Sequence, residues 1–555
     1  MRCAVKKKWL LRIALVVAVL VVASGLVAFL VIGDAVDTMF GSDTPDATPA
    51  LAQRSPDRYV LANVAALGPA GDGFQAGQSI LIEDGVIRAV GPSGDYDDSL
   101  AVVDGSGLFV VPGYTDSHVH LWNSRNDLLV YLANGVTQVR EMHGQPHHLQ
   151  WKEEIASGRI GPDIYVVAAQ LASYGFWEGL WIGWTSRRNV VRSPADTTGA
   201  IAALVDQGYD AVKASSFLGR ENYLQASRIA RDMSVPFVGH LPLAADLPDL
   251  WASSQSEVAH VEELVKALAR ESGGFRSTGA EEFLAHVRTR RVEIAERLVA
   301  NGIHVTSTLA LSESFGRQAT DLENLLPEVA LAYVNPGVAA GQAMGWLPGV
   351  NPYRVPEAAR SDGWRDRNAT YWAAYAQAHH LMLEALLDAG ATILVGTDAN
   401  VPVMVPGFSM HQEMQALVAA GMSPAEVLAS ATSRPGRWMG WNTGEIGEGF
   451  RANLVLLRGN PLDDISATAS IEAVIKDGRL FSRADLDAML RAVEDANRGA
   501  LPAPAPGGGR QRTQSAGGPS AGGGTSGSNS TGTGSGRTSG SGGGGESTSS
   551  APGMQ

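Results

Sequence analysis

Cysteine is almost absent from this chain of 555 residues, in which Cys3 is the only one. A single cysteine excludes an intrachain disulfide and every zinc site built on cysteine ligands. Basic residues are also in deficit: 43 lysines and arginines face 57 acidic residues, and the net charge is −14. That balance argues against a nucleic-acid partner, which requires a basic surface. Any bound metal must therefore depend on His, Asp, Glu or a modified Lys.

The N-terminal segment is apolar over a long run. Three lysines at 6–8 precede an uncharged stretch from Ile13 to Gly33. At about 1.5 Å per residue, a helix over Ile13–Ile32 measures about 30 Å, the thickness of a bilayer core. We predict a single-pass transmembrane anchor over residues 13–33. Residues 1–12 then form a basic cytoplasmic segment and the catalytic part lies on the extracytoplasmic side of the cell membrane, because positive charge stays inside.

A cleaved signal peptide is the alternative, since Ala23 and Ser24 are small enough for a cleavage site. The apolar run continues past them to Ile32, whereas the apolar core of a signal peptide usually has about 7–15 residues. This length favours an uncleaved anchor, followed by a linker over residues 34–57.

The C-terminal segment, residues 502–555, consists mainly of Gly, Ser, Thr and Pro. Such a composition buries too little apolar surface to offset the entropy of ordering, so we predict a disordered tail. Residues 483–501, just before it, are predicted to form a helix.

Short apolar runs alternate with amphipathic stretches between residues 58 and 482. The candidate strands are Thr115–His120, Val136–Arg140, Ile164–Ala168, Ala211–Ser215, Pro236–His240, Val258–Val261, His304–Leu309 and Thr392–Asp398. Helical stretches such as Asn222–Met233 and Val292–Ala300 separate several of them. Eight βα units predict an α/β fold, a (β/α)8 TIM-like barrel over residues 112–444. The long interval before the last strand predicts an insertion at Ser312–Tyr371.

Metal-binding residue types stand at or near the ends of these strands, where barrel active sites form. His118 and His120 end the first strand, and residues two apart point to the same side. The later strands carry Lys213, His240, His260 and Asp398. Each residue alone has a structural explanation, because such a histidine is usually hydrogen-bonded, a lysine can snorkel and an aspartate can cap a helix. Their joint occurrence in strand order predicts a metal site.

Several segments resemble motifs of the amidohydrolase superfamily. They are Val111–His120 around the first strand, Asn134–Arg140 in the second and Gly396–Asp398 in the last. Val212–Tyr223 and Val235–Pro242 are similar to the branch that contains imidazolonepropionase-like proteins and metal-dependent Xaa-Pro dipeptidases (prolidases). The resemblance covers residues 58–482. It implies that residues 58–111 and 445–482 join into a small β-sandwich beside the barrel.

The resemblance also implies a centre with two divalent metal ions. His118, His120 and Asp398 would hold one ion, His240 and His260 the other, and a carbamate on Lys213 would bridge them. Nitrogen and oxygen ligands suit Zn²⁺ best, while manganese, cobalt and iron stay open. Asp398 would move a proton from water to the leaving group.

Two further residues are candidates for the catalytic site. Tyr223 would hydrogen-bond an oxyanion or a substrate carboxylate, or else pack as a core residue. His143, which follows the second strand, is a candidate for contact with the substrate or for support of a ligand.

The expected reaction is hydrolysis of an amide or dipeptide bond in a small molecule. Leu243 stands where many deaminases of the superfamily carry a proton-shuttling glutamate, which argues against deamination. A lactonase, esterase or organophosphate-type hydrolase is the alternative on the same centre, and an inactive envelope binding protein is a third. A homo-oligomer stays open. Three tryptophans would line an apolar pocket, or pack against the bilayer or another subunit: Trp177, Trp181 and Trp184.

Overall fold

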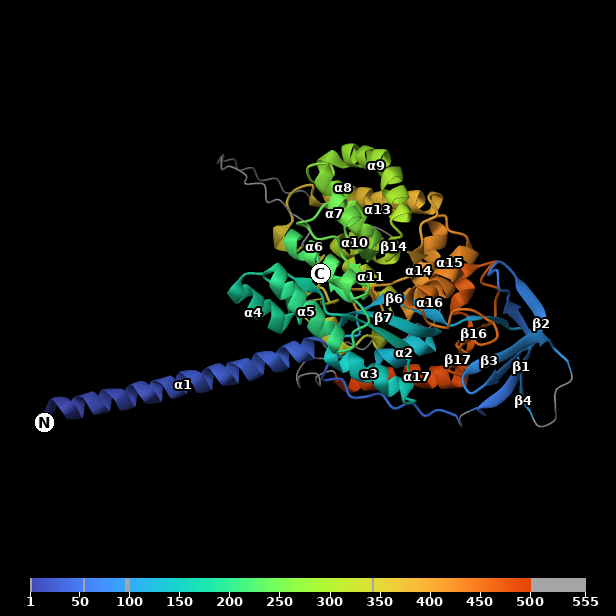
Figure 1. The fold of residues 1–555 in the computed structure, drawn as a ribbon, viewed down its shortest axis with the longest axis horizontal. Coiled ribbons are helices and arrows are strands. Elements are labelled where there is room, and N and C mark those ends of the chain that lie inside the picture. The colour runs from blue at the N-terminus through green and yellow to red at the C-terminus, as the bar shows by residue number, and fades with distance from the viewer. Residues whose placement is uncertain (1, 53–54, 95–99, 342–343, 501–555) are drawn as a thin grey trace, which may run out of the picture. The chain divides into compact units, whose positions relative to one another are not determined.

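The computed structural model describes residues 2–52, 55–94, 100–341 and 344–500 (Figure 1). The predicted tail over residues 502–555 lies outside the described residues. The apolar N-terminal run belongs to one helix, α1 (Arg2–Met39). Its segment Ile13–Met39 is long and apolar enough to cross a membrane, and an 18-residue window within it has a mean hydropathy of 3.1.

The helix α1 is longer than the predicted anchor. The helix continues through residues 34–39, which the sequence analysis placed in the linker. The physical reason is tertiary packing, because Val36 and Phe40 are only 4% and 9% exposed. The end of α1 is thus held against the folded domain.

Eight short strands form the predicted barrel. They are β6 (Tyr114–Val119), β7 (Val136–Gly144), β8 (Asp163–Ala168), β11 (Val212–Ala214), β12 (Phe237–Gly239), β13 (Gln255–Val258), β14 (His304–Thr306) and β15 (Ile393–Leu394). Strands β6–β8 form one parallel sheet, and β11–β15 belong to another. Two parallel bridges, Val119 with Ala399 and Val167 with Ala211, join the two sheets at both seams. The strands therefore close into a ring, and the predicted barrel is confirmed.

Most of the strands end before their predicted bounds, and two of these differences have the largest effect near the site. Strand β13 ends at Val258, so the prediction of Val258–Val261 was placed too late, and His260 instead precedes helix α8 (Val261–Glu271). Strand β15 is also shorter than predicted, and Asp398 lies beyond its end with φ of 56°. This left-handed conformation is uncommon for a residue with a side chain. It accompanies a hydrogen bond of 2.8 Å from the Asp398 N–H to the His118 carbonyl.

Helices cover the outside of the barrel. They include α2 (Asp127–Ala133), α3 (Pro146–Ala156), α5 (Pro194–Asp206), α6 (Arg220–Asp232), α7 (Leu247–Ala252), α8, α9 (Ala280–Ala300), α13 (Trp364–Asp388), α14 (Phe408–Ala419), α15 (Pro424–Ala431) and α16 (Ser433–Met439). The predicted insertion between β14 and β15 is largely helical. It contains most of α10 (Leu309–Thr320), α11 (Leu322–Leu325) and α12 (Pro336–Ala340), and it runs into α13.

Both flanks of the barrel meet in one eight-stranded sheet. Its strands are β1 (Arg58–Leu67), β2 (Phe74–Glu83), β3 (Val86–Pro92), β4 (Ala101–Asp104), β5 (Phe109–Pro112), β16 (Leu454–Leu457), β17 (Ile471–Lys476) and β18 (Arg479–Ser482). Antiparallel pairing of β5 with β16 joins the two flanks. Strand β1 pairs with β2, β4 and β5. Hydrogen bonds therefore connect all eight strands, and the two flanks form one continuous sheet. Helix α17 (Arg483–Ala500) follows β18.

Candidate metal centre

The carboxyl ends of the barrel strands bring six predicted residues together. His118 lies in β6 and Lys213 in β11, and the others follow their strands directly or within a few residues. The six side chains belong to His118, His120, Lys213, His240, His260 and Asp398, and none is more than 5% exposed. Parallel strands that end on one side of a barrel concentrate their terminal residues there.

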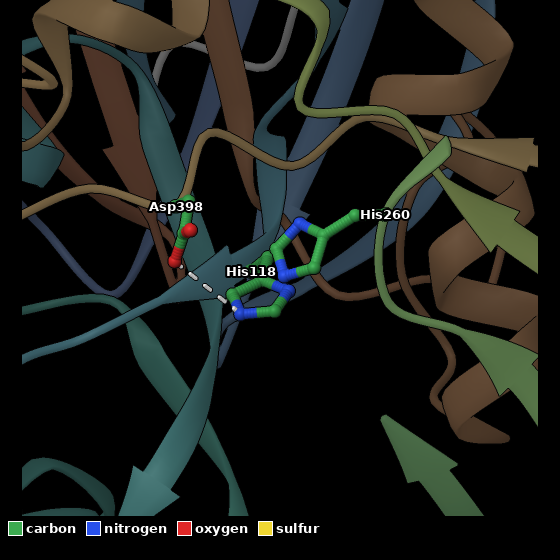
Figure 2. A group of neighbouring side chains, drawn as sticks. All are labelled: His118, His260 and Asp398. Carbon is green, nitrogen blue, oxygen red and sulfur yellow. Dashed lines mark ion pairs between the residues drawn. The ribbon is translucent and has the colours of Figure 1, made fainter. Parts of the chain in front are cut away.

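Three of these residues form a compact donor cluster. One ligand atom from each of His118, His260 and Asp398 lies within 4.8 Å of the others (Figure 2). The Asp398 Oδ1 atom is 3.4 Å from His118 Nε2 and 3.0 Å from His120 Nε2. The resemblance implies that His118 and His260 hold different ions of one centre, and in the structure the two side chains lie in the same cluster.

Lys213 and His240 complete the cluster. Lys213 Nζ lies 3.3 Å from His118 Nε2, and the rings of His240 and His260 are 5.2 Å apart between centroids. The six residues are thus linked by short distances from β6 around to β15.

Several donor atoms in this cluster have no hydrogen-bond partner among the described residues. They are Nδ1 of His118, Nδ1 of His120 and Nε2 of His240, while His120 Nε2 and Asp398 Oδ1 lie 3.0 Å apart without the angles of a hydrogen bond. Burying unpaired polar atoms is costly, so such a concentration requires a compensating ligand. Imidazole nitrogens and a carboxylate oxygen are the donors that zinc and similar divalent ions use. The residues present therefore fit a metal centre.

Burial sets the charge state of these donors. It lowers the pKa of all four histidines, that of His260 to about 3. The histidines are then neutral at pH 7, which is the form that binds metal. Burial raises the pKa of Asp398. The opposite effect of His120, His260 and Lys213 is larger and holds that pKa well below its usual range. Burial also lowers the pKa of Lys213 to about 8, against the opposing effect of nearby carboxylates.

Two ligand histidines are oriented by residues that the sequence analysis did not single out. His240 Nδ1 lies 2.8 Å from Ser216 Oγ and 3.3 Å from Glu263 Oε1, and this leaves Nε2 for a metal. His260 Nδ1 lies 3.0 Å from Thr308 Oγ1. Such contacts fix the tautomer and the ring direction of a ligand. A carboxylate three residues after His260 was the available signal for Glu263.

Two buried carboxylates position the backbone around the first strand. Asp116 accepts hydrogen bonds from Thr397 Oγ1 at 2.6 Å and from the His118 N–H at 3.2 Å, which ties β6 to the segment before Asp398. Glu141 accepts from the His143 N–H at 2.7 Å and also from the backbone after His120. Burial raises the pKa of each to about 7. Asp116 lies within the Val111–His120 motif, whereas no feature of the sequence analysis marked Glu141.

The two other predicted catalytic residues have different positions. His143 lies beside the cluster, with its ring centroid 6.3 Å from that of His120. Tyr223 is not brought to the cluster. Its hydroxyl donates to Gln255 Oε1 at 2.7 Å, at the start of β13 and not at its carboxyl end, and its ring packs on Phe237. These contacts correspond to the alternative reading of Tyr223 as a core residue.

Replacing Glu263 with glutamine is expected to weaken metal binding by about 10–100-fold, the range typical of residues that support a ligand. The amide removes the negative charge that faces His240 Nδ1. Titration of the demetallated protein with zinc would measure the affinity.

Glu262→Gln is the matched control for that variant. Glu262 bonds the Tyr375 hydroxyl at 2.8 Å and pairs with Lys266, as Glu263 also does. The control should therefore retain wild-type affinity. Equal zinc affinities in the two variants would contradict the role of Glu263.

Comparison with known proteins supports this arrangement. The family model described as "Amidohydrolase family" matches residues 220–481. The curated ochratoxinase of Aspergillus niger is 34% identical over 120 residues, which span 20% of this chain and 24% of that protein. The chain is thus aligned with only about a quarter of that relative's length.

Solved structures match over much more of the chain. A bottromycin amidohydrolase has a TM-score of 0.62 and 24% identity, over 80% of this chain and 91% of that one. An Xaa-Pro dipeptidase crystallised with methionine in its active site has a TM-score of 0.55 and 17% identity, over 77% of this chain and 100% of that one. These likenesses establish the shared α/β fold. The family match over residues 220–481, which include the second half of the barrel and the C-terminal flank, shows that this part of the chain is similar to the amidohydrolase family.

Proposed function

We propose that this protein is a metal-dependent hydrolase that cleaves a carbon–nitrogen bond in a small amide or dipeptide. The proposal rests on the buried cluster of six candidate metal-binding residues, in which several donor atoms lack a hydrogen-bond partner. The fold that this chain shares with the Xaa-Pro dipeptidase supports the choice of substrate class.

Two divalent ions are proposed for this centre, with Zn²⁺ as the metal that the nitrogen and oxygen donors suit best. His118, His120 and Asp398 would hold one ion, and His240 and His260 the other. Lys213 would link them as a carbamate, formed when its neutral amine attacks carbon dioxide and releases a proton. A lysine with a pKa of about 8 is neutral in a substantial fraction of molecules near pH 7.5, which favours that reaction.

The residues of the chain then have distinct tasks. When bound, divalent ions supply Lewis acidity and a water nucleophile of lowered pKa. The Asp398 carboxylate would accept a proton from the attacking water and deliver it to the leaving nitrogen. The low pKa of Asp398 keeps its carboxylate ionised, which is the form that can accept a proton. His143, beside His120, is proposed to contact the substrate, and its backbone is fixed by Glu141.

A substrate screen with metal analysis tests the function. The purified full chain would be assayed with Xaa-Pro dipeptides, N-acyl amino acids, lactones and aryl esters, and its metal content would be measured. We expect preferred hydrolysis of an amide and two ions per chain. Fewer than one ion per chain would sink the binuclear proposal, and a preference for lactones or esters would redirect the substrate class.

The N-terminal helix is proposed to remain attached as a membrane anchor with the barrel on the extracytoplasmic side. Phe40 packs against Trp122 at 4.9 Å between ring centroids, and Trp122 stacks on His120 at 4.8 Å. The Asn123 N–H donates to the Phe40 carbonyl at 2.9 Å. Phe40, directly after α1, therefore packs beside the candidate metal centre and ties the end of the helix to the barrel.

We expect the mature protein purified from membranes to keep residues 13–33. Mass spectrometry of its N-terminal peptides measures this directly. A mature chain that begins after residue 24 would instead identify a cleaved signal peptide. As a control, salt and alkaline washes should not release the retained form, because an apolar helix that spans a bilayer is held without electrostatic attraction.

A further inference from the structure

One short helix presents an apolar face to solvent beside the metal centre. Helix α4 (Phe176–Thr185) lies between β9 (Leu171–Ala172) and β10 (Asn189–Val190), after the third barrel strand. The exposed side chains of this face are Phe176 at 55%, Trp177 at 80%, Leu180 at 51% and Trp181 at 52%. Clustered exposed apolar residues mark a binding surface. We call these four residues the α4 face.

The α4 face is adjacent to the candidate membrane-spanning helix. Trp184, at the end of α4, stacks on Phe29 of α1 with ring centroids 4.7 Å apart and an angle of 12° between the planes. Phe29 belongs to the apolar segment Ile13–Met39. It lies about 6 Å along the helix before Gly33, where the uncharged run ends. Trp184 therefore lies at the level where a bilayer would meet water, the depth that tryptophan prefers in membrane proteins.

We propose that the α4 face docks into the interfacial layer of the same lipid bilayer that α1 spans. This inference uses the proposed anchor but not the proposed hydrolytic activity. Arg192 lies over the ring of Phe176 at 5.0 Å, so a cation at the edge of the face is available to lipid headgroups. Helix α4 itself carries one charged residue, Glu178.

The size of the face favours lipid over a second copy of the chain. A fully buried aromatic side chain contributes about 150–250 Å². With the exposed fractions given above, the four side chains offer roughly 500 Å² in total. A stable protein interface needs about 800 Å² from each partner. A bilayer needs no minimum area from the α4 face alone, because the same bilayer also surrounds α1.

Docking at α4 would act on the rim of the metal centre. The Ser186 carbonyl directly after α4 lies 3.0 Å from His143 Nε2, and the Arg187 carbonyl accepts from Gln145 Nε2 at 3.2 Å. Arg187 also forms an ion pair with Asp37 of α1. The membrane-facing helix, the anchor and the loop beside His143 are thus joined by direct contacts.

Site-directed spin labelling of the full chain tests the proposal. In a Cys3→Ser background, a nitroxide would be attached to a cysteine introduced by Trp177→Cys or Trp181→Cys. The labelled protein would be reconstituted in vesicles of phosphatidylcholine and phosphatidylglycerol. Molecular oxygen collects in the bilayer and a nickel chelate stays in water, so the two relaxation agents report depth. We expect both labels to be more accessible to oxygen than to nickel.

Two further labels serve as controls. Val102→Cys on β4 has a similar exposure of 50% and should be more accessible to nickel. Leu20→Cys in α1 reports whether the anchor itself has inserted. If Leu20 is in lipid while positions 177 and 181 match position 102, the α4 proposal is overturned. Dipolar broadening at 177 that disappears on dilution with unlabelled protein would also overturn it, in favour of a second copy of the chain.

Discussion

Replacing Asp398 with asparagine is expected to lower kcat/KM for amide hydrolysis by about 10²–10⁴-fold, the range for loss of a general acid–base group. Asparagine keeps the shape of the side chain but has no negative charge and cannot carry the proton. Asp398 Oδ1 faces both His118 and His120, so the change also removes a charged metal donor. Steady-state kinetics together with metal content per chain would measure both effects.

Asp127→Asn is the matched control for that variant. Asp127 is an equally buried carboxylate, but Ser124 and Asn400 occupy its two oxygens at 2.6 Å each. Burial raises its pKa to about 7, so an uncharged amide resembles a form that it already adopts. We expect a much smaller loss of kcat/KM. An Asp398→Asn variant that retains activity within tenfold of the wild type would contradict the proton-transfer role.

Replacing Lys213 with alanine is expected to reduce the metal content from two ions per chain toward one and to lower kcat/KM by at least about 100-fold. The reason is the loss of a group that lies 3.3 Å from His118, in a strand between those that carry the two groups of histidines. Growth with isotope-labelled bicarbonate should give a carbamate signal in the wild type that is absent from the variant.

Two other variants make this test specific. Lys213→Glu places a carboxylate in the same region and should recover part of the metal content. Lys152→Ala removes a lysine that pairs with Asp210, so it should leave metal content and activity unchanged. Full activity with two ions in Lys213→Ala would show that the carbamate bridge is wrong.

The order of residue types along the chain was enough to predict the barrel and to nominate its metal donors. Histidines two apart at the end of a strand must point to the same side, and later strands of a parallel barrel must end on that side. These rules are local or topological, so they apply before any packing is known. The apolar run that begins at Ile13 could likewise be recognised from composition alone.

The supports of the site needed the tertiary structure, because they depend on contacts between residues far apart in sequence. Asp116 binds Thr397, and Phe40 reaches Trp122 and so the ring next to His120. Tyr223 was a catalytic candidate in the sequence, yet its hydroxyl donates a hydrogen bond to Gln255.

The Lys213–His240–His260–Asp398 series thus follows from the sequence alone, whereas the arrangement of these residues does not. The left-handed turn at Asp398 and the partners of His240 and His260 arise only when strands from opposite ends of the domain are closed into one ring. Packing across that ring leaves donor atoms unpaired in a buried space, and this physical feature separates a metal centre from a set of structural histidines.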